Sequence, residues 1–167
     1  MKSYRSAIVL ICLALGLAAA VFAGCEAVKP VPEAKLQVIP DKTVISPELL
    51  KAPVKFAGSG FAPKEMVIVE MIVPPGVEIK GVAKGEDVGL AYGNADERGE
   101  FQAAMAATAT LNWFFQTGWS PTLAPDLKQA KPIPPGRYEI KATGADSGAV
   151  GKAILEILPP PPPSEKK

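Results

Sequence analysis

The stretch that decides the fold is residues 54–69, VKFAGSGFAPKEMVIV. Apolar residues alternate with other residues on both sides of a central Gly-Ser-Gly, which is typical of two short strands joined by a turn. Glycine adopts positive φ without steric cost, so Gly58 and Gly60 allow the first strand to end sharply. Phe61 can then fold back as a plug for the core. The stretch therefore predicts a strand, a glycine turn and a second strand around a buried Phe61.

The same alternation continues on both sides of this stretch and predicts about seven strands, at residues 36–38, 54–56, 66–69, 88–92, 101–105, 138–142 and 149–158. Helix signals are few, namely a turn at 46–50 with Ser46 as its cap and another at 110–115. Pro135 and Gly136 predict a type II turn, and residues 144–148 predict a hairpin connection. We therefore expect an all-β fold, an immunoglobulin-like antiparallel β-sandwich over residues 35–158.

Three motifs resemble the recurring bacterial immunoglobulin-like surface domain. They are GSGFAPKE at 58–65, Ala95-Asp96 before Gly99 and Phe101, and Pro135-Gly136 before an alternating run that begins at Tyr138. The family usually has glycine where Lys64 stands, and this chain carries long insertions at 74–89 and 106–134. Members act mostly as spacers, adhesion modules or binding modules without shared catalytic residues, so the resemblance implies a non-catalytic role.

Composition excludes several classes of function. The formal net charge of the 167 residues is +1, so there is no basic excess and no nucleic acid partner is expected. The chain has no histidine, which removes the commonest general base and the commonest zinc ligand. The acidic residues Glu86, Asp87, Asp96 and Glu97 lack the spacing of a calcium loop, and we interpret them as solvated carboxylates. No enzyme activity, metal or cofactor is predicted.

The N-terminus has the layout of an export signal. Lys2 and Arg5 precede a stretch without charge that continues to Cys25, and this stretch predicts a signal helix. The run Phe22-Ala23-Gly24-Cys25 resembles the lipobox of bacterial lipoproteins, with phenylalanine in place of the usual leucine. The resemblance implies a signal peptide at 1–24 that is removed, and acylation of Cys25. The protein would then be anchored in the lipid bilayer of the cell envelope, at the outer membrane in a diderm host and otherwise at the outer face of the plasma membrane.

Two segments flank the predicted domain. Residues 25–34 contain two prolines and no apolar periodicity, which indicates a tether. Residues 159–167 begin with five prolines and predict an extended polyproline tail.

The candidate partner-binding residues are the aromatic cluster Trp113, Phe114, Phe115 and Trp119 within the second insertion. Such rings either anchor an envelope protein or glycan, or fold back to cap one open end of the sandwich. The sequence favours a non-catalytic, membrane-anchored scaffold or interaction module. The alternatives are a carbohydrate-binding module that uses the loop from Trp113 to Trp119, and an accessory subunit of a cell-envelope hydrolase.

Overall fold

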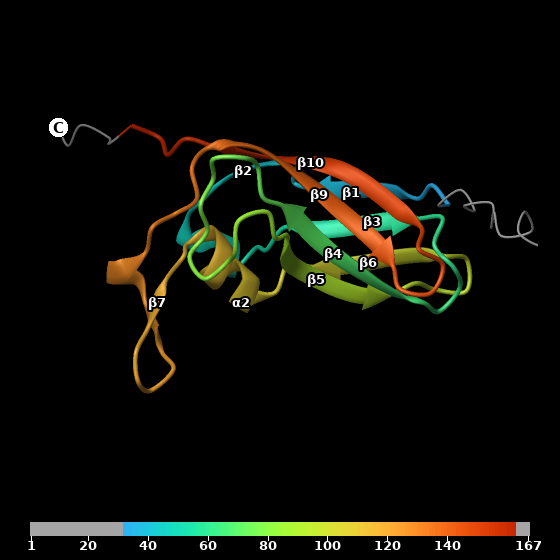
Figure 1. Cartoon of the computed structure of the whole chain (residues 1–167), viewed down its shortest axis with the longest axis horizontal. Helices are drawn as coiled ribbons and strands as arrows, with labels where there is room; N and C mark the ends of the chain where they lie inside the picture. Colours follow the sequence, from blue (N-terminus) through green and yellow to red (C-terminus); the bar gives the residue numbers. More distant parts are fainter. Residues whose placement is uncertain (1–31, 163–167) are drawn as a thin grey trace, which may run out of the picture. The chain divides into compact units, whose positions relative to one another are not determined.

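The computed structural model describes residues 32–162, and they form two packed β-sheets and a separate two-stranded hairpin (Figure 1). The predicted signal peptide, Cys25 with the first part of the predicted tether, and residues 163–167 lie outside the described residues. One sheet has the order β1 (Lys35–Ile39), β3 (Lys55–Ser59), β6 (Glu100–Ala104). The other has the order β2 (Lys42–Val44), β10 (Val150–Leu158), β9 (Gly136–Gly144), β4 (Met66–Ile72), β5 (Val88–Asn94).

The topology confirms the predicted all-β, immunoglobulin-like sandwich. Each of the seven expected strands is present, and the chain alternates between the sheets so that β9 pairs with both β4 and β10 while β3 and β6 pair with each other. One further strand, β2, was not predicted. It pairs in parallel with the end of β10, which departs from the antiparallel pattern elsewhere in the two sheets. Its three residues, KTV, are too few to show alternation.

The core lies between the sheets and is built by the inward positions of each strand. Along β4, Val67, Val69 and Met71 are fully buried, while the residues between them face outward. The same core cluster contains large side chains of the other sheet, Phe56 and Phe101, and of the neighbouring strands β9 and β10, namely Tyr138, Ile140 and Leu155. This alternation is the physical basis of the sequence prediction.

The glycine turn is built as expected at Gly60 but not at Gly58. Gly60 has a φ of 92°, and Phe61 is buried with its ring at 5.3 Å and 87° from the ring of Phe101. Gly58 instead lies inside β3, without positive φ. A Cβ there would stand 2.7 Å from Phe101 Cε1. The same Cβ would stand 2.7 Å from the carbonyl oxygen of Lys35, so Gly58 is required by the close approach of the neighbouring backbone and of this ring, and not by the turn.

Lys64 occupies a left-handed backbone position, with a φ of 65°. In this conformation a Cβ lies too close to the backbone, which costs roughly 1–2 kcal/mol, and glycine avoids this cost because it has no Cβ. We expect Lys64→Gly to raise the free energy of unfolding by about 0.5–1 kcal/mol, because the flexibility of glycine in the unfolded chain offsets part of the gain. Denaturant titration measures this. Lys84→Gly, at an exposed position without positive φ, is the control and should not raise the free energy of unfolding.

The predicted type II turn at Pro135 and Gly136 is wrong. Gly136 begins β9 and lacks the positive φ that such a turn needs at its third position. The corner is held instead by Tyr138, whose hydroxyl donates a 2.6 Å hydrogen bond to the carbonyl of Pro134. Burial raises the pKa of Tyr138. This is the tyrosine corner of immunoglobulin-like sandwiches, at the start of the equivalent strand.

The predicted hairpin at 144–148 is present, whereas the predicted cap at Ser46 is not. The hairpin at 144–148 is confirmed, with a 3.0 Å bond from Gly148 N–H to the carbonyl of Gly144 and a positive φ of 68° at Gly148. A 3-10 helix covers Pro47–Leu50, but the Ser46 side chain makes no capping hydrogen bond.

The end of the predicted tether is part of the domain. Ala34 N–H donates to the carbonyl of Val150 at 3.0 Å, and Val150 N–H donates to the carbonyl of Pro32 at 3.1 Å. Ala34 is buried in the core cluster. Residues 32–34 therefore belong to the sandwich and not to a separate tether.

A buried carboxylate joins two loops at one end of the sandwich. Glu65 is 2% exposed and accepts hydrogen bonds from Ala62 N–H, Asp146 N–H, and both the N–H and the hydroxyl of Ser147. Burial alone raises the pKa of Glu65, but these bonds to the charged form outweigh it and hold the pKa below its usual value. Glu65 therefore links the β3–β4 turn to the β9–β10 hairpin as an ionised group.

Candidate functional site

The insertion between β6 and β9 places the aromatic cluster at one end of the sandwich. It contains a helical turn, α2 (Ala107–Ala109) with η2 (Thr110–Phe114), then a hairpin of β7 (Gly118–Trp119) and β8 (Pro125–Asp126), then η3 (Leu127–Gln129). Phe114 is fully buried and Phe115 nearly so. The carbonyls of both accept backbone hydrogen bonds, from Ile133 and Lys131 respectively, which close the insertion onto the core.

The two tryptophans differ in their surroundings. Trp113 is partly buried against the core, and its Nε1 donates to the carbonyl of Gly89 at 3.0 Å. Together with the bond from Ala106 N–H to the carbonyl of Leu90, this contact covers part of the free edge of β5. Trp119 is 43% exposed, and its Nε1 donates to Asn112 Oδ1 at 2.9 Å. The indole of Trp119 is thus held in place with much of its surface open.

An apolar groove lies beside Trp113 on the outer face of the five-stranded sheet. We call it the edge groove and define it by its principal lining residues, Met66, Ile68, Tyr92, Asn112 and Trp113. Its volume is about 470 Å³. Tyr92 is 77% exposed, and Met66 and Ile68 are also exposed.

A bulge explains why Tyr92 lies in this groove. Strict alternation along the predicted strand at 88–92 would put Tyr92 on the same face as Val88 and Leu90, but the pairing of β4 with β5 shifts between Val69 and Glu70. Leu90 and the next residue, Ala91, are therefore both buried, and Tyr92 points outward opposite Ile68. The outward pair of Tyr92 and Ile68 could not be predicted, because strict alternation does not hold through the bulge.

The outer face of the same sheet is charged beyond the groove. Lys141 lies 3.2 Å from a Glu70 carboxylate oxygen and 3.1 Å from one of Asp87, and Lys152 pairs with Glu139 at 2.7 Å. Burial lowers the pKa of Lys141, but the two carboxylates outweigh this and raise it above its ordinary value. The edge groove is thus an apolar area bordered by ion pairs.

The tip of the β7–β8 hairpin displays an apolar side chain in an unfavourable backbone position. Leu123 has a φ of 57° and is 80% exposed. The turn is braced by Ser120, whose N–H donates to the carbonyl of Ala124 and whose hydroxyl oxygen accepts from Ala124 N–H. A bulky residue in this region costs roughly 1–2 kcal/mol. Figure 1 shows the hairpin extending beyond the end of the two sheets.

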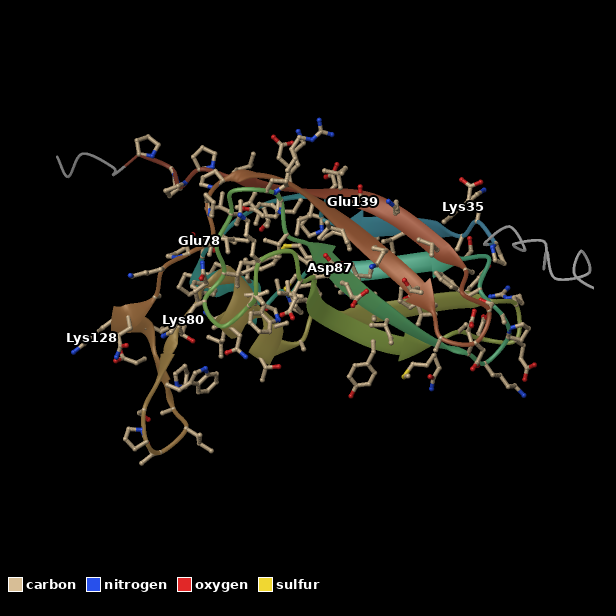
Figure 2. All side chains as sticks on the ribbon, in the orientation of Figure 1. Lys35, Glu78, Lys80, Asp87, Lys128 and Glu139 are labelled. Atoms are coloured by element: carbon tan, nitrogen blue, oxygen red, sulfur yellow. The ribbon has the colours of Figure 1, made fainter. Side chains whose placement is uncertain are left out.

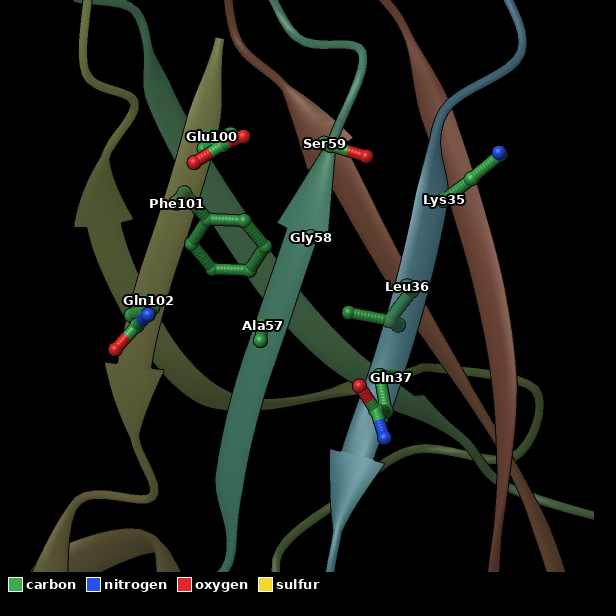
Figure 3. Close-up of a pocket in the computed structure, with 9 residues that line it drawn as sticks. All are labelled: Lys35, Leu36, Gln37, Ala57, Gly58, Ser59, Glu100, Phe101 and Gln102. Atoms are coloured by element: carbon green, nitrogen blue, oxygen red, sulfur yellow. The ribbon is translucent and has the colours of Figure 1, made fainter. Parts of the chain in front are cut away.

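The opposite face of the sandwich is polar. On the three-stranded sheet, Ala57 lies between Gln37 and Gln102, and Ser59 lies between Lys35 and Glu100 (Figure 3). The small residues of β3 form the floor of a shallow groove of about 440 Å³. It has no exposed aromatic ring in its lining, which makes it a suitable control surface.

The four acidic residues considered for calcium are not gathered into one site. Asp87 pairs with Lys141, Glu97 with Lys64 at 2.9 Å, and Asp96 accepts from the N–H groups of Arg98 and Glu100. Within residues 32–162, no group of three or more acidic or cysteine side chains is placed to hold a metal ion. In the same part of the chain, no helix is long and apolar enough to cross a membrane.

Comparisons with known proteins add little. No protein-family model matches the chain, and no curated protein matches it. Among solved structures, the fold is similar to part of the β-glucosidase DesR from Streptomyces venezuelae, solved in complex with D-glucose. That match has 11% identity and a TM-score of 0.40, and covers 75% of this chain and 15% of the enzyme. Similarity at this level carries no argument about activity.

Proposed function

We propose that the protein is a non-catalytic, lipid-anchored interaction module of the cell envelope, which binds an envelope protein through the edge groove. The lipobox-like run Phe22-Ala23-Gly24-Cys25 supports the anchor. Acyl chains on Cys25 hold a protein firmly, because each buried methylene contributes about 0.8 kcal/mol. The sandwich carries the binding surface.

The observation that carries the binding role is the exposure of the edge groove. Met66, Ile68 and Tyr92 form a contiguous apolar area on a sheet that otherwise bears ion pairs. Apolar areas of this kind on a small domain mark interaction sites. Tyrosine and tryptophan carry much of the binding energy in protein interfaces because they supply large contact area at little entropic cost.

The ionisable side chains of the protein support a non-catalytic role. The chain has no histidine, and its buried carboxylate, Glu65, is fully engaged by four hydrogen bonds from the neighbouring loops. A general acid needs a proton to give near neutral pH, whereas the pKa of Glu65 is lowered. Glu65 is therefore a structural group.

Carbohydrate binding is the second candidate function. Tyr92 and Trp113 line the same groove as the Asn112 side-chain amide, and aromatic faces with a nearby amide suit the apolar face and hydroxyls of a sugar. A glycan array decides between the two functions. Binding of one glycan class that is lost in Tyr92→Ala would favour the sugar.

Site-directed photo-crosslinking in cells tests the protein-binding role. A photoreactive residue at Tyr92 should give a discrete adduct with one envelope protein, because this side chain lies at the groove opening. The same residue at Gln37, on the polar face shown in Figure 3, is the matched control and should give none. Equal adducts from both positions, or adducts from neither, would contradict the proposal.

A further inference from the structure

The β7–β8 hairpin projects from the domain and has an uncharged tip. No charged residue stands between Glu100 and Asp126 in the sequence, although 21% of the chain is charged. Within this stretch the hairpin exposes Trp119 and Leu123, and Leu127 is exposed just after it. Apart from Leu123, residues 120–125 contain only serine, threonine, proline and alanine. The tip at residues 119–125 can thus leave water without burying a charged side chain.

Basic residues surround the base of this hairpin. Lys128 lies in η3, two residues after the end of β8, and Figure 2 shows its side chain at the same end of the domain as Lys80. Lys80 and Lys131 line one cleft with Gln129, together with a single acid, Glu78. The nearest acid on the hairpin itself, Asp126, is turned back to accept from Lys128 N–H and Gln129 Nε2. An apolar tip bordered by lysines is complementary to a bilayer surface with anionic phosphates.

We propose that the β7–β8 hairpin enters the interfacial region of a lipid bilayer and forms a second membrane contact besides Cys25. Leu123 at the tip lies among the upper acyl chains, and Trp119 and Leu127, which are nearer the base of the hairpin, lie at the level of the headgroups, where tryptophan is enriched. Lys128 and Lys131 lie against lipid phosphates. The exposed leucine at the tip has a role in this arrangement, since the chain holds it outward in a left-handed conformation. The inference rests on the proposed function only in placing the domain at a membrane.

Fluorescence quenching in vesicles tests the hairpin directly, because the chain has two tryptophans. The full processed chain with Trp113→Phe leaves Trp119 as its single reporter. In vesicles of phosphatidylcholine and phosphatidylglycerol we expect its emission to shift to shorter wavelength and to be quenched when the acyl chains carry bromine. The matched variant Trp119→Phe leaves Trp113, which is packed against the core and should be quenched much less.

Leu123→Asn supplies the second arm of the test. Asparagine tolerates positive φ, so this variant keeps the turn while it removes the apolar tip. In the Trp113→Phe background it should abolish most of the quenching, whereas Ile154→Asn, at an exposed position on β10, should not.

Trp119 emission that bromine does not quench overturns the hairpin contact, whether or not the chain stays with the vesicles. Quenching that survives Leu123→Asn also overturns it, as does a photoreactive residue at position 123 that captures a protein and no phospholipid. Sedimentation of the chain with vesicles and its lipid mass report the Cys25 anchor separately, so failure of the anchor and failure of the hairpin are distinguishable.

Discussion

Replacing Phe114 with alanine should destabilise the domain by about 3–5 kcal/mol, the usual range for truncating a buried aromatic side chain. Phe114 is fully buried and belongs to the same core cluster as Tyr138 and Leu90. The cavity left by the ring would lie under the insertion, where the Phe114 carbonyl also accepts from Ile133 N–H. Denaturant unfolding of purified protein measures the change.

Trp119→Ala is the matched control for this prediction. Trp119 is on the same insertion but exposed, and it would lose one exposed hydrogen bond to Asn112. Its effect should be about 1 kcal/mol or less. If both variants cost the same, the insertion does not pack on the core as described.

Glu65→Gln should destabilise the domain by about 3 kcal/mol at neutral pH, because hydrogen bonds to a charged group contribute roughly 1.5–3 kcal/mol each. The amide nitrogen that replaces one carboxylate oxygen would face N–H donors, and at least one buried donor would lose its acceptor. Glu97→Gln, which changes an exposed acid paired with Lys64, is the control and should change stability little. Thermal or denaturant melts of the two variants compare them.

Glu65 also gives stability a predictable dependence on pH. Its pKa is lower in the folded state than the ordinary value of 4.5, so its contribution is complete above that value. It is lost as pH falls below 4.5 and through the folded pKa, where the carboxylate takes up its proton. Glu65→Gln should therefore show a smaller loss of stability between neutral and acid pH than the wild-type protein. An identical pH slope in the two proteins would show that Glu65 is not the buried anion described.

Strand positions could be predicted because the sandwich buries one face of each strand. Val67 and Val69 in β4 alternate with outward residues, and this period is visible in the sequence. Prediction failed where local geometry interrupts the period. The bulge between β4 and β5 turned Tyr92 outward, and the strand β2 is too short to have a pattern. The corner before β9 depends on a hydrogen bond from Tyr138 to the backbone, which no spacing of Pro135 and Gly136 reveals.

The candidate site was visible in the sequence only as a collection of aromatic residues. Trp113, Phe114 and Phe115 are consecutive, so their burial depends on the helical turn that carries them and not on any alternation. The edge groove had one signal in the sequence. Met66 and Ile68 are apolar on the face of β4 opposite Val67 and Val69, and a strand that is apolar on both faces needs a partner for its outer face. The buried position of Glu65 had no signal in the sequence, because its partners Asp146 and Ser147 are distant in the chain.

Lipidation of Cys25 is the basis of the proposed membrane-anchored module, and intact-mass measurement of the detergent-extracted protein tests it most directly. The wild-type chain should begin at Cys25 and carry the added mass of diacylglycerol, with or without a further acyl chain. Cys25→Ser should remain an uncut precursor without lipid, because the thiol is the acceptor and lipoprotein processing follows lipidation. A mature wild-type mass without added lipid, or cleavage at another residue, would contradict the anchor and with it the proposed location of the domain.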